Sequence, residues 1–300
     1  MGRETKTFLS DVKFHAPETL AEALRLLKDL EGARVMAGGT DLLVDLKQGL
    51  IELQNIVSLQ KLEELEKIEL EENRIRIGAL VTPKLIMTHP LINQHLPALA
   101  EAAGSLAAHQ VRTMATIGGN IASAVPSADL PPSLIAAEAS VELRGLDSTR
   151  EESLTEFFTG PRETCCVEGE ILTFITIPVP PPNTGISYKK FTLREANALA
   201  VASVAARLTL KGSIIQKAVV VLGAVAPTPF LASKASQSLV GNKPSEELFH
   251  QAASIAQKES RPISDIRGSI WFREALIDTL TQRALEEAWD RARGPSQEEG

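Results

Sequence analysis

The chain has 300 residues, enough for two or three compact units, and it is 44% hydrophobic, 23% charged and only 4% aromatic. Its net charge of −7, with no long run of Lys or Arg, argues against nucleic acid or an anionic membrane surface as a partner. No apolar run approaches the roughly 18–20 residues that cross a bilayer, and the N-terminus lacks the apolar segment of a signal peptide. We therefore expect a globular, cytoplasmic protein.

The first sixty residues have the pattern of a β-α-β unit. Thr19 and Glu22 form a capping box, which predicts that a helix begins there and carries leucines on one face. A strand is predicted at 34–37, a short amphipathic helix at 42–48, and the next strand at 55–59. A pair of glycines therefore lies at the junction between a strand and a helix.

The next hundred residues are predicted to contain a hairpin, helices and further strands. Apolar residues alternate with charged ones on both sides of a turn at 71–73, which indicates the hairpin. Thr82-Pro83 predicts a helix start, and the alanine-rich residues 96–108 predict a second helix. Further strands are expected at 141–144 and 171–177.

Four prolines among residues 178–182 interrupt any regular element, so a domain boundary is predicted near 178–185. The elements predicted after it are strands at 198–210 and 213–226, helices at 245–259 and 268–291, and a frayed polar tail at 294–300. Strands that precede helices in this order indicate an α+β second domain.

Two glycine pairs are the most informative local feature: Gly38-Gly39 before Thr40 and Asp41, and Gly118-Gly119 before Asn120. Each pair follows an apolar, strand-like stretch, where glycine lets the backbone turn sharply and brings bare N–H groups close to an anion. The polar residues that follow can bind phosphate or sugar oxygens, or cap the next helix. Two such loops, about eighty residues apart, can close on one long anionic ligand such as a dinucleotide. For an isolated pair the alternative is an ordinary hairpin turn.

The sequence shows no pattern of metal ligands. Cys165 and Cys166 are adjacent, so they cannot link distant parts of the fold, and a [2Fe–2S] cluster needs about four ligands. The five histidines show no zinc-type spacing. We expect two small, partly buried cysteines and no metal site.

The sequence around the second glycine pair, residues 109–131, resembles the FAD-binding (medium) subunit of the molybdenum hydroxylases, the xanthine dehydrogenase and carbon monoxide dehydrogenase family. Residues 37–42 are similar to that family's other FAD loop. The resemblance extends over nearly the full length, through phrases at 170–178 with 188–194, at 223–229 and at 264–269. Five phrases in the expected order are far more specific than either glycine pair.

The resemblance implies an α+β fold in two domains. The first is an FAD-binding domain of the vanillyl-alcohol oxidase (PCMH) type at residues 1–180, with sub-parts of about 1–60 and 61–180. The second is a smaller α+β C-terminal domain of the CO dehydrogenase flavoprotein type at 185–293, followed by the tail at 294–300. Some members of the wider fold attach flavin through a histidine in the first loop, where this chain has Thr40 and Asp41. We therefore expect non-covalent FAD.

By matching position, the resemblance places FAD contacts in both loops and at a few positions beyond them. The implied cofactor-binding residues are Val35, Met36, Ala37, Gly38, Gly39, Thr40, Asp41, Leu42, Thr116, Ile117, Gly118, Gly119, Asn120, Ser123, Asp129, Leu172, Lys189 and Lys190. No catalytic side chain and no metal ligand is expected, because the cofactor carries the chemistry.

Several of these positions have alternative roles. Asp129 would accept a hydrogen bond from a ribose hydroxyl, or else cap the following helix. Leu172 would pack near the adenine, or else be a core leucine. One of Lys189 and Lys190 would stabilise reduced anionic flavin, because alternation along a strand puts only one of them on that face; a solvated lysine is the alternative. Arg112 would serve the diphosphate or make a surface salt bridge.

The resemblance also implies a role in electron transfer. In this family, electrons leave the substrate at a molybdenum cofactor, pass through two [2Fe–2S] clusters and reach FAD. The molybdenum cofactor and the clusters are expected only on partner chains, a large molybdenum subunit and a small [2Fe–2S] subunit. FAD would then pass electrons to NAD, quinone, oxygen or a carrier protein. The alternatives are a stand-alone flavin-dependent reductase of the same superfold and a flavin-free structural subunit.

Overall fold

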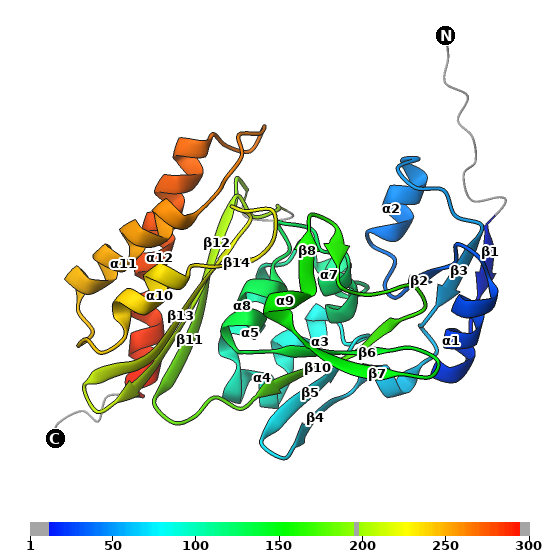
Figure 1. Cartoon of the computed structure of the whole chain (residues 1–300), viewed down its shortest axis with the longest axis horizontal. Helices are drawn as coiled ribbons and strands as arrows, with labels where there is room; N and C mark the ends of the chain where they lie inside the picture. The colour runs from blue at the N-terminus through cyan, green and yellow to red at the C-terminus, as the bar shows by residue number, and fades with distance from the viewer. Residues whose placement is uncertain (1–11, 195–197, 295–300) are drawn as a thin grey trace, which may run out of the picture.

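The computed structural model describes residues 12–194 and 198–294, so the predicted polar tail lies outside it except for Gly294. Figure 1 shows a small sheet and its helices at the N-terminal end, a larger sheet beside them, and a second large sheet backed by the C-terminal helices. Helices fill the space between the two large sheets. This mixture of helices and antiparallel strands confirms the predicted α+β class.

The N-terminal part is a parallel three-stranded sheet with strand order β1-β3-β2. The capping box is confirmed, because Thr19 Oγ1 accepts a hydrogen bond from the Glu22 N–H at 3.2 Å. The predicted β-α-β unit is confirmed as β2, α2 and β3. The elements are β1 (Lys13–His15), α1 (Leu20–Asp29), β2 (Arg34–Met36), α2 (Leu42–Lys47) and β3 (Asn55–Ser58).

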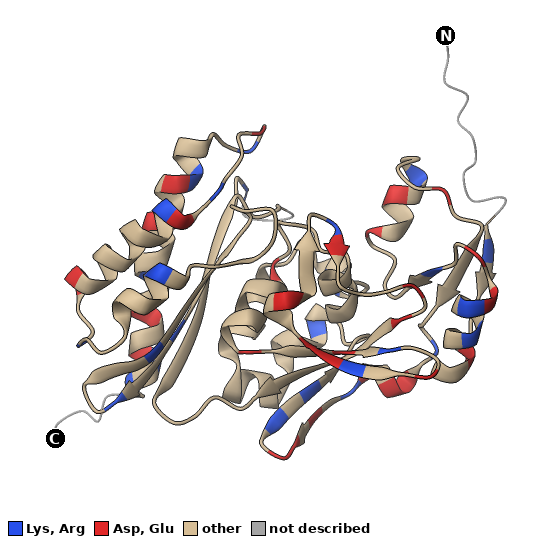
Figure 2. Cartoon of the chain, in the orientation of Figure 1, with Lys and Arg blue, Asp and Glu red and all other residues tan. Residues whose placement is uncertain are grey.

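The second part is an antiparallel five-stranded sheet with strand order β4-β5-β10-β6-β7. The predicted hairpin is confirmed, and its turn residues Glu72 and Asn73 both have positive φ, as a tight hairpin turn requires. Figure 2 colours many residues of these strands as charged, while Ile75, Ile77 and Val141 belong to the buried core. The elements are a 3₁₀ turn at Glu63–Glu66, then β4 (Ile68–Glu71), β5 (Arg74–Gly78), β6 (Ser140–Arg144), β7 (Thr149–Ser153) and β10 (Ile171–Pro178).

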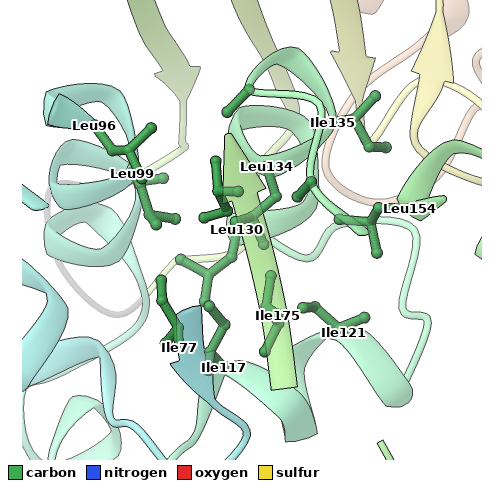
Figure 3. Packing of buried hydrophobic residues seen from close by; sticks show 14 of the residues in the cluster. Ile77, Leu96, Leu99, Ile117, Ile121, Leu130, Leu134, Ile135, Leu154 and Ile175 are labelled. Atoms are coloured by element: carbon green, nitrogen blue, oxygen red, sulfur yellow. The ribbon is translucent and has the colours of Figure 1, made fainter. Parts of the chain in front are cut away.

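Short helices cover the inner face of this sheet. Figure 3 shows leucines and isoleucines of α5, α7 and α8 packed against Ile77 of β5 and Ile175 of β10. α3, α4 and α5 each begin with a proline, the residue that tolerates the first helical position. The elements are α3 (Pro83–Thr88), α4 (Pro90–His95), α5 (Pro97–Ser105), α6 (His109–Arg112), α7 (Ile117–Ala122), α8 (Leu130–Ala136), α9 (Leu154–Phe157), β8 (Phe158–Gly160) and β9 (Glu163–Thr164).

The third part is an antiparallel four-stranded sheet, order β11-β12-β13-β14. Ile186, Tyr188 and Ala205 on one face of this sheet join the core of the five-stranded sheet, and the other face packs against α10, α11 and α12. The elements are β11 (Thr184–Phe191), β12 (Ala202–Lys211), β13 (Ile214–Gly223), β14 (Phe230–Leu231), α10 (Ser233–Leu239), α11 (Glu246–Glu259) and α12 (Ile270–Arg293).

The structure corrects two predictions. The single helix predicted at 96–108 ends at Ser105, because the chain turns through Ala107 at a φ of 39° before α6 begins. The second glycine pair does not follow a strand: it follows α6 and lies in the first turn of α7. The chain passes from β10 to β11 within the predicted break at 178–185. The strand β11 and the helix α10 were not predicted.

Candidate functional site

The first glycine loop connects β2 to α2 and carries backbone N–H groups without partners. Gly39 has a φ of +71°, a conformation that favours glycine. Within the described part of the chain, the N–H groups of Gly38, Gly39, Thr40 and Asp41 donate no hydrogen bond. Asp41 stands at the N-cap position of α2 but makes no capping bond. The loop therefore offers several unpaired donors to an anion, as the sequence predicts.

The second glycine loop differs from the prediction, because its N–H groups are already paired. Ile117 and Gly118 donate to the carbonyls of Val81 and Ala79, both at 2.9 Å, and Gly119 donates to Thr116 Oγ1 at 3.0 Å. A Cβ on Gly118 would lie 2.6 Å from the Ala79 Cβ, so glycine is needed here for close packing and not to expose bare donors.

The first glycine loop lies in direct contact with the residues that lead into the second. A Cβ on Gly38 would lie 1.8 Å from the Met114 carbonyl oxygen and 3.0 Å from the Ala115 Cα, which no side chain allows. Only glycine lets the backbones approach so closely. The sequence predicts that they face one ligand, and the close contact brings backbone segments about eighty positions apart in the sequence side by side.

Arg162 also ties the two loops together, although the sequence analysis did not single it out. Its N–H donates to the Ala124 carbonyl at 2.8 Å, just after α7, and its guanidinium pairs with Asp45 of α2 at 2.6 Å. No local pattern identifies such a residue, since both partners are distant in sequence. Its position fixes α2 relative to the second loop.

A buried polar cluster joins the second loop region to β11. Lys190 Nζ lies 2.8 Å and 2.9 Å from the two Asp129 carboxylate oxygens and also donates to the Ser105 carbonyl at 2.9 Å. Tyr188 donates its hydroxyl to Asp129 at 3.2 Å. The side chains of Asp129 and Lys190 are both more than nine-tenths buried.

The electrostatics of this cluster follow from its burial. Burial raises the pKa of the Asp129 carboxyl above its usual range, against the opposing effects of Lys190 and Tyr188. Burial, with the nearby Asp129 carboxylate, raises the pKa of the Tyr188 hydroxyl well above its usual range. The lysine charge is compensated by the carboxylate, so the pair adds little net charge.

The two adjacent lysines point to opposite sides of β11. Lys189 points to the other side of β11, where it pairs with Glu287 of α12, so Lys190 is the lysine that faces Asp129. Asp129 occupies the N-cap position of α8 without a capping bond, and Asn120 Oδ1 instead accepts the Leu130 N–H at 3.4 Å.

Three other candidates make contacts within the chain. Leu172 is buried in the core that joins the two large sheets. Ser123 Oγ donates to the Asn120 carbonyl at 3.3 Å. Arg112 donates to the carbonyls of Leu106 and Ala107 at 2.8 and 2.9 Å and makes no salt bridge among the described residues. Tyr188, by contrast, was missed, although its two-residue spacing from Lys190 puts both on one strand face.

No metal site is found among the described residues, where no group of three or more His, Cys, Asp or Glu side chains gathers. Cys165 and Cys166 are half-buried free thiols, as expected, and burial raises the pKa of the Cys166 thiol to about 11. None of the helices in the described ranges is long and apolar enough to cross a membrane.

Comparisons with known proteins show the family to which the chain belongs. The family model described as the FAD binding domain in molybdopterin dehydrogenase matches residues 10–180, and that of the CO dehydrogenase flavoprotein C-terminal domain matches residues 186–288. The chain is 33% identical to the glyceraldehyde dehydrogenase medium chain of Sulfolobus acidocaldarius, over 90% of this chain and 95% of that one. It is 33% identical to the carbon monoxide dehydrogenase medium chain of Afipia carboxidovorans, over 93% and 97%.

A solved structure gives the same result. The carbon monoxide dehydrogenase of Hydrogenophaga pseudoflava superposes with a TM-score of 0.90 at 32% identity, over 93% of this chain and 98% of that one. The chain therefore belongs to the FAD-binding medium subunits of the molybdenum hydroxylase family, the oxidoreductases related to xanthine dehydrogenase and carbon monoxide dehydrogenase.

Proposed function

We propose that the chain is the FAD-carrying electron-transfer subunit of a cytoplasmic molybdenum hydroxylase complex. It would accept electrons from the [2Fe–2S] clusters of a small partner subunit, while a large partner subunit holds the molybdenum cofactor. NAD, quinone, oxygen or a carrier protein would receive the electrons. The domain limits at 1–180 and 185–293 and the tail at 294–300 are part of this proposal.

The observation that best supports the proposal is the contact between the two glycine loops. The unpaired N–H groups of residues 38–41 suit the negatively charged diphosphate of FAD. The close backbone approach at Gly38 leaves no room for a side chain between the two loops. The residues present thus fit the cofactor. The proposed contacts include Val35 to Leu42 from the first loop and Thr116 to Asn120 with Ser123 from the second.

The remaining residues would position the cofactor rather than react with it. FAD, when bound, supplies the chemistry of taking up and releasing electrons. Asp129 and Lys190 would hold a preformed, nearly neutral polar pair at the site. Thr116 Oγ1 accepts the Gly119 N–H, which leaves its own proton available to donate. We propose Leu172 as an apolar contact for the cofactor. Lys189, paired with Glu287, is the weakest of the proposed contacts.

An absorption spectrum of the purified chain, before and after acid precipitation, tests the proposal. Flavin bands that move to the supernatant on precipitation support non-covalent FAD. Co-purification with iron- and molybdenum-containing chains supports the complex. A colourless chain that takes up no added FAD contradicts the proposal.

A further inference from the structure

The hairpin of β8 and β9 carries an arginine in a backbone conformation that favours glycine. Pro161 and Arg162 are the two turn residues of this hairpin, and Arg162 has a φ of +62°. A proline followed by a residue with positive φ is the arrangement of a type II turn, in which glycine or asparagine is favoured at the second of these positions. An arginine there is strained, and strained residues are concentrated at functional sites.

The stability of the fold does not explain this arginine. The guanidinium of Arg162 pairs with Asp45 of α2 at 2.6 Å, but the arginine side chain is 56% exposed. An ion pair with that exposure contributes little to stability, because water screens it and a long side chain has to be ordered. The strain of the turn offsets this small contribution.

Both partners of Arg162 are bonded directly to a glycine loop. The Asp45 N–H donates to the carbonyl of Asp41, in the first loop, at 2.9 Å. Ala124, which accepts the Arg162 N–H, follows directly after the residue whose N–H donates to the Gly119 carbonyl at 3.0 Å, in the second loop. Figure 1 shows the hairpin beside α7. Arg162 therefore links α2 to α7, the two helices that begin at the glycine loops.

Of these two helices, α2 is the loosely held one. Only Leu46 of its six residues is buried, in a small cluster with Met36 and Ile56. By contrast, α7 buries Ile117 and Ile121 in the large core between the sheets. An element with few buried contacts opens locally at a low cost in free energy. The helix that can move away from the second loop is thus α2, and the pair of Arg162 with Asp45 restrains it.

We propose that the Arg162–Asp45 pair is a clasp that holds α2 against the second glycine loop and slows the release of FAD, with Arg162 as a positioning residue. This rests on the proposed function, in which FAD lies between the two loops. A cofactor that both loops hold is released when one of them moves away, and the clasp opposes that movement. Restraint of a binding site in its bound arrangement acts mainly on the rate of dissociation.

The test replaces each partner of the clasp by asparagine, alone and together. Arg162→Asn removes the charge and supplies a residue that accepts the left-handed conformation of the turn. Lys61→Asn is the matched control, because Lys61 pairs with Glu18 at 2.9 Å, both side chains are exposed, and neither residue belongs to a glycine loop. Release of FAD from the loaded full-length chain is followed by flavin fluorescence after dilution. The stability of each apo chain is measured by unfolding in urea.

We expect Arg162→Asn and Asp45→Asn each to raise the dissociation rate of FAD about tenfold, as the loss of one charge-assisted hydrogen bond implies. The double variant should release FAD no faster than either single variant, because each substitution alone already opens the clasp. Lys61→Asn should release FAD at the wild-type rate. The free energy of unfolding of every apo chain should stay close to that of the wild type, because exposed ion pairs contribute little to it.

Other outcomes overturn the proposal. A wild-type release rate in Arg162→Asn excludes the clasp. Slower release from Asp45→Asn shows that Arg162 acts by its charge on the diphosphate, because that substitution removes a negative charge near an anion. Losses of FAD binding and of unfolding free energy that run in parallel assign the pair to the fold alone. A wild-type chain that takes up no FAD contradicts the proposed function itself, and the clasp with it.

Discussion

The substitution Gly38→Ala would disturb the contact between the two glycine loops. The added Cβ would lie 1.8 Å from the Met114 carbonyl oxygen, whereas real Cβ atoms essentially never come within 3.0 Å of another heavy atom, so the backbones would have to separate by about 1 Å or more. Overpacking of this kind costs about 1–3 kcal/mol. About 1.4 kcal/mol corresponds to a tenfold change in affinity. If the loops shift apart, we expect the affinity for FAD to fall roughly 10- to 100-fold. If they stay in place, we expect the free energy of unfolding of the apo chain to fall by about 1–3 kcal/mol instead.

Gly104→Ala in α5 is the matched control. There the nearest atom to a new Cβ is the Met87 Cε at 3.6 Å, an ordinary contact, and alanine in a helix interior is favoured over glycine by about 0.5–1 kcal/mol. The assay titrates each apo chain with FAD by flavin fluorescence and follows its unfolding in urea. A Gly38→Ala chain with wild-type FAD affinity and an unchanged unfolding midpoint would refute the reasoning.

Two further predictions concern charged groups. Lys190→Met leaves the buried Asp129 carboxylate without its partner and should lower the free energy of unfolding by about 3–5 kcal/mol. Lys189→Met removes a partly exposed ion pair and should lower it by less than about 1 kcal/mol. Equal losses for the two variants in urea unfolding would contradict this difference. The hydrogen bonds and charge of Arg150 hold the pKa of Glu170 below its usual value of 4.5, so Glu170 stabilises the fold fully above about pH 4.5 and loses this effect as the pH falls through its lowered pKa. The difference in the free energy of unfolding between wild type and Glu170→Gln should therefore be constant near neutral pH and shrink in acid. A difference that grows in acid would contradict a lowered pKa of Glu170 in the folded chain.

The local patterns of the sequence predicted the elements well where a few neighbouring residues decide the structure. The helix after Thr19 and the hairpin at 71–73 both follow from short-range capping and turn preferences, and both are confirmed. The helix predicted at 96–108 was wrong in its extent, because the turn at Ala107 is not encoded by any strong helix-breaking residue.

The role of each glycine pair could not be read locally. Both pairs have similar neighbours, yet Gly38 meets the backbone of Met114 and Gly118 meets Ala79, and these partners are far apart in sequence. Pairing with Ala79 and Val81 removes the donors of the second loop, while those of the first remain unpaired within the described chain. Sequence alternation likewise predicts that one of two adjacent lysines faces the site, but which one depends on the distant partners Asp129 and Glu287.

Amide hydrogen exchange with and without FAD tests the central claim most directly. The N–H groups of residues 38–41 have no described acceptor, so they should exchange rapidly in the apo chain and slow markedly when FAD binds. Those of Ile117 and Gly118 are already bonded to carbonyl groups and should change much less. FAD that binds without slowing exchange at 38–41 would contradict a cofactor held by the first glycine loop.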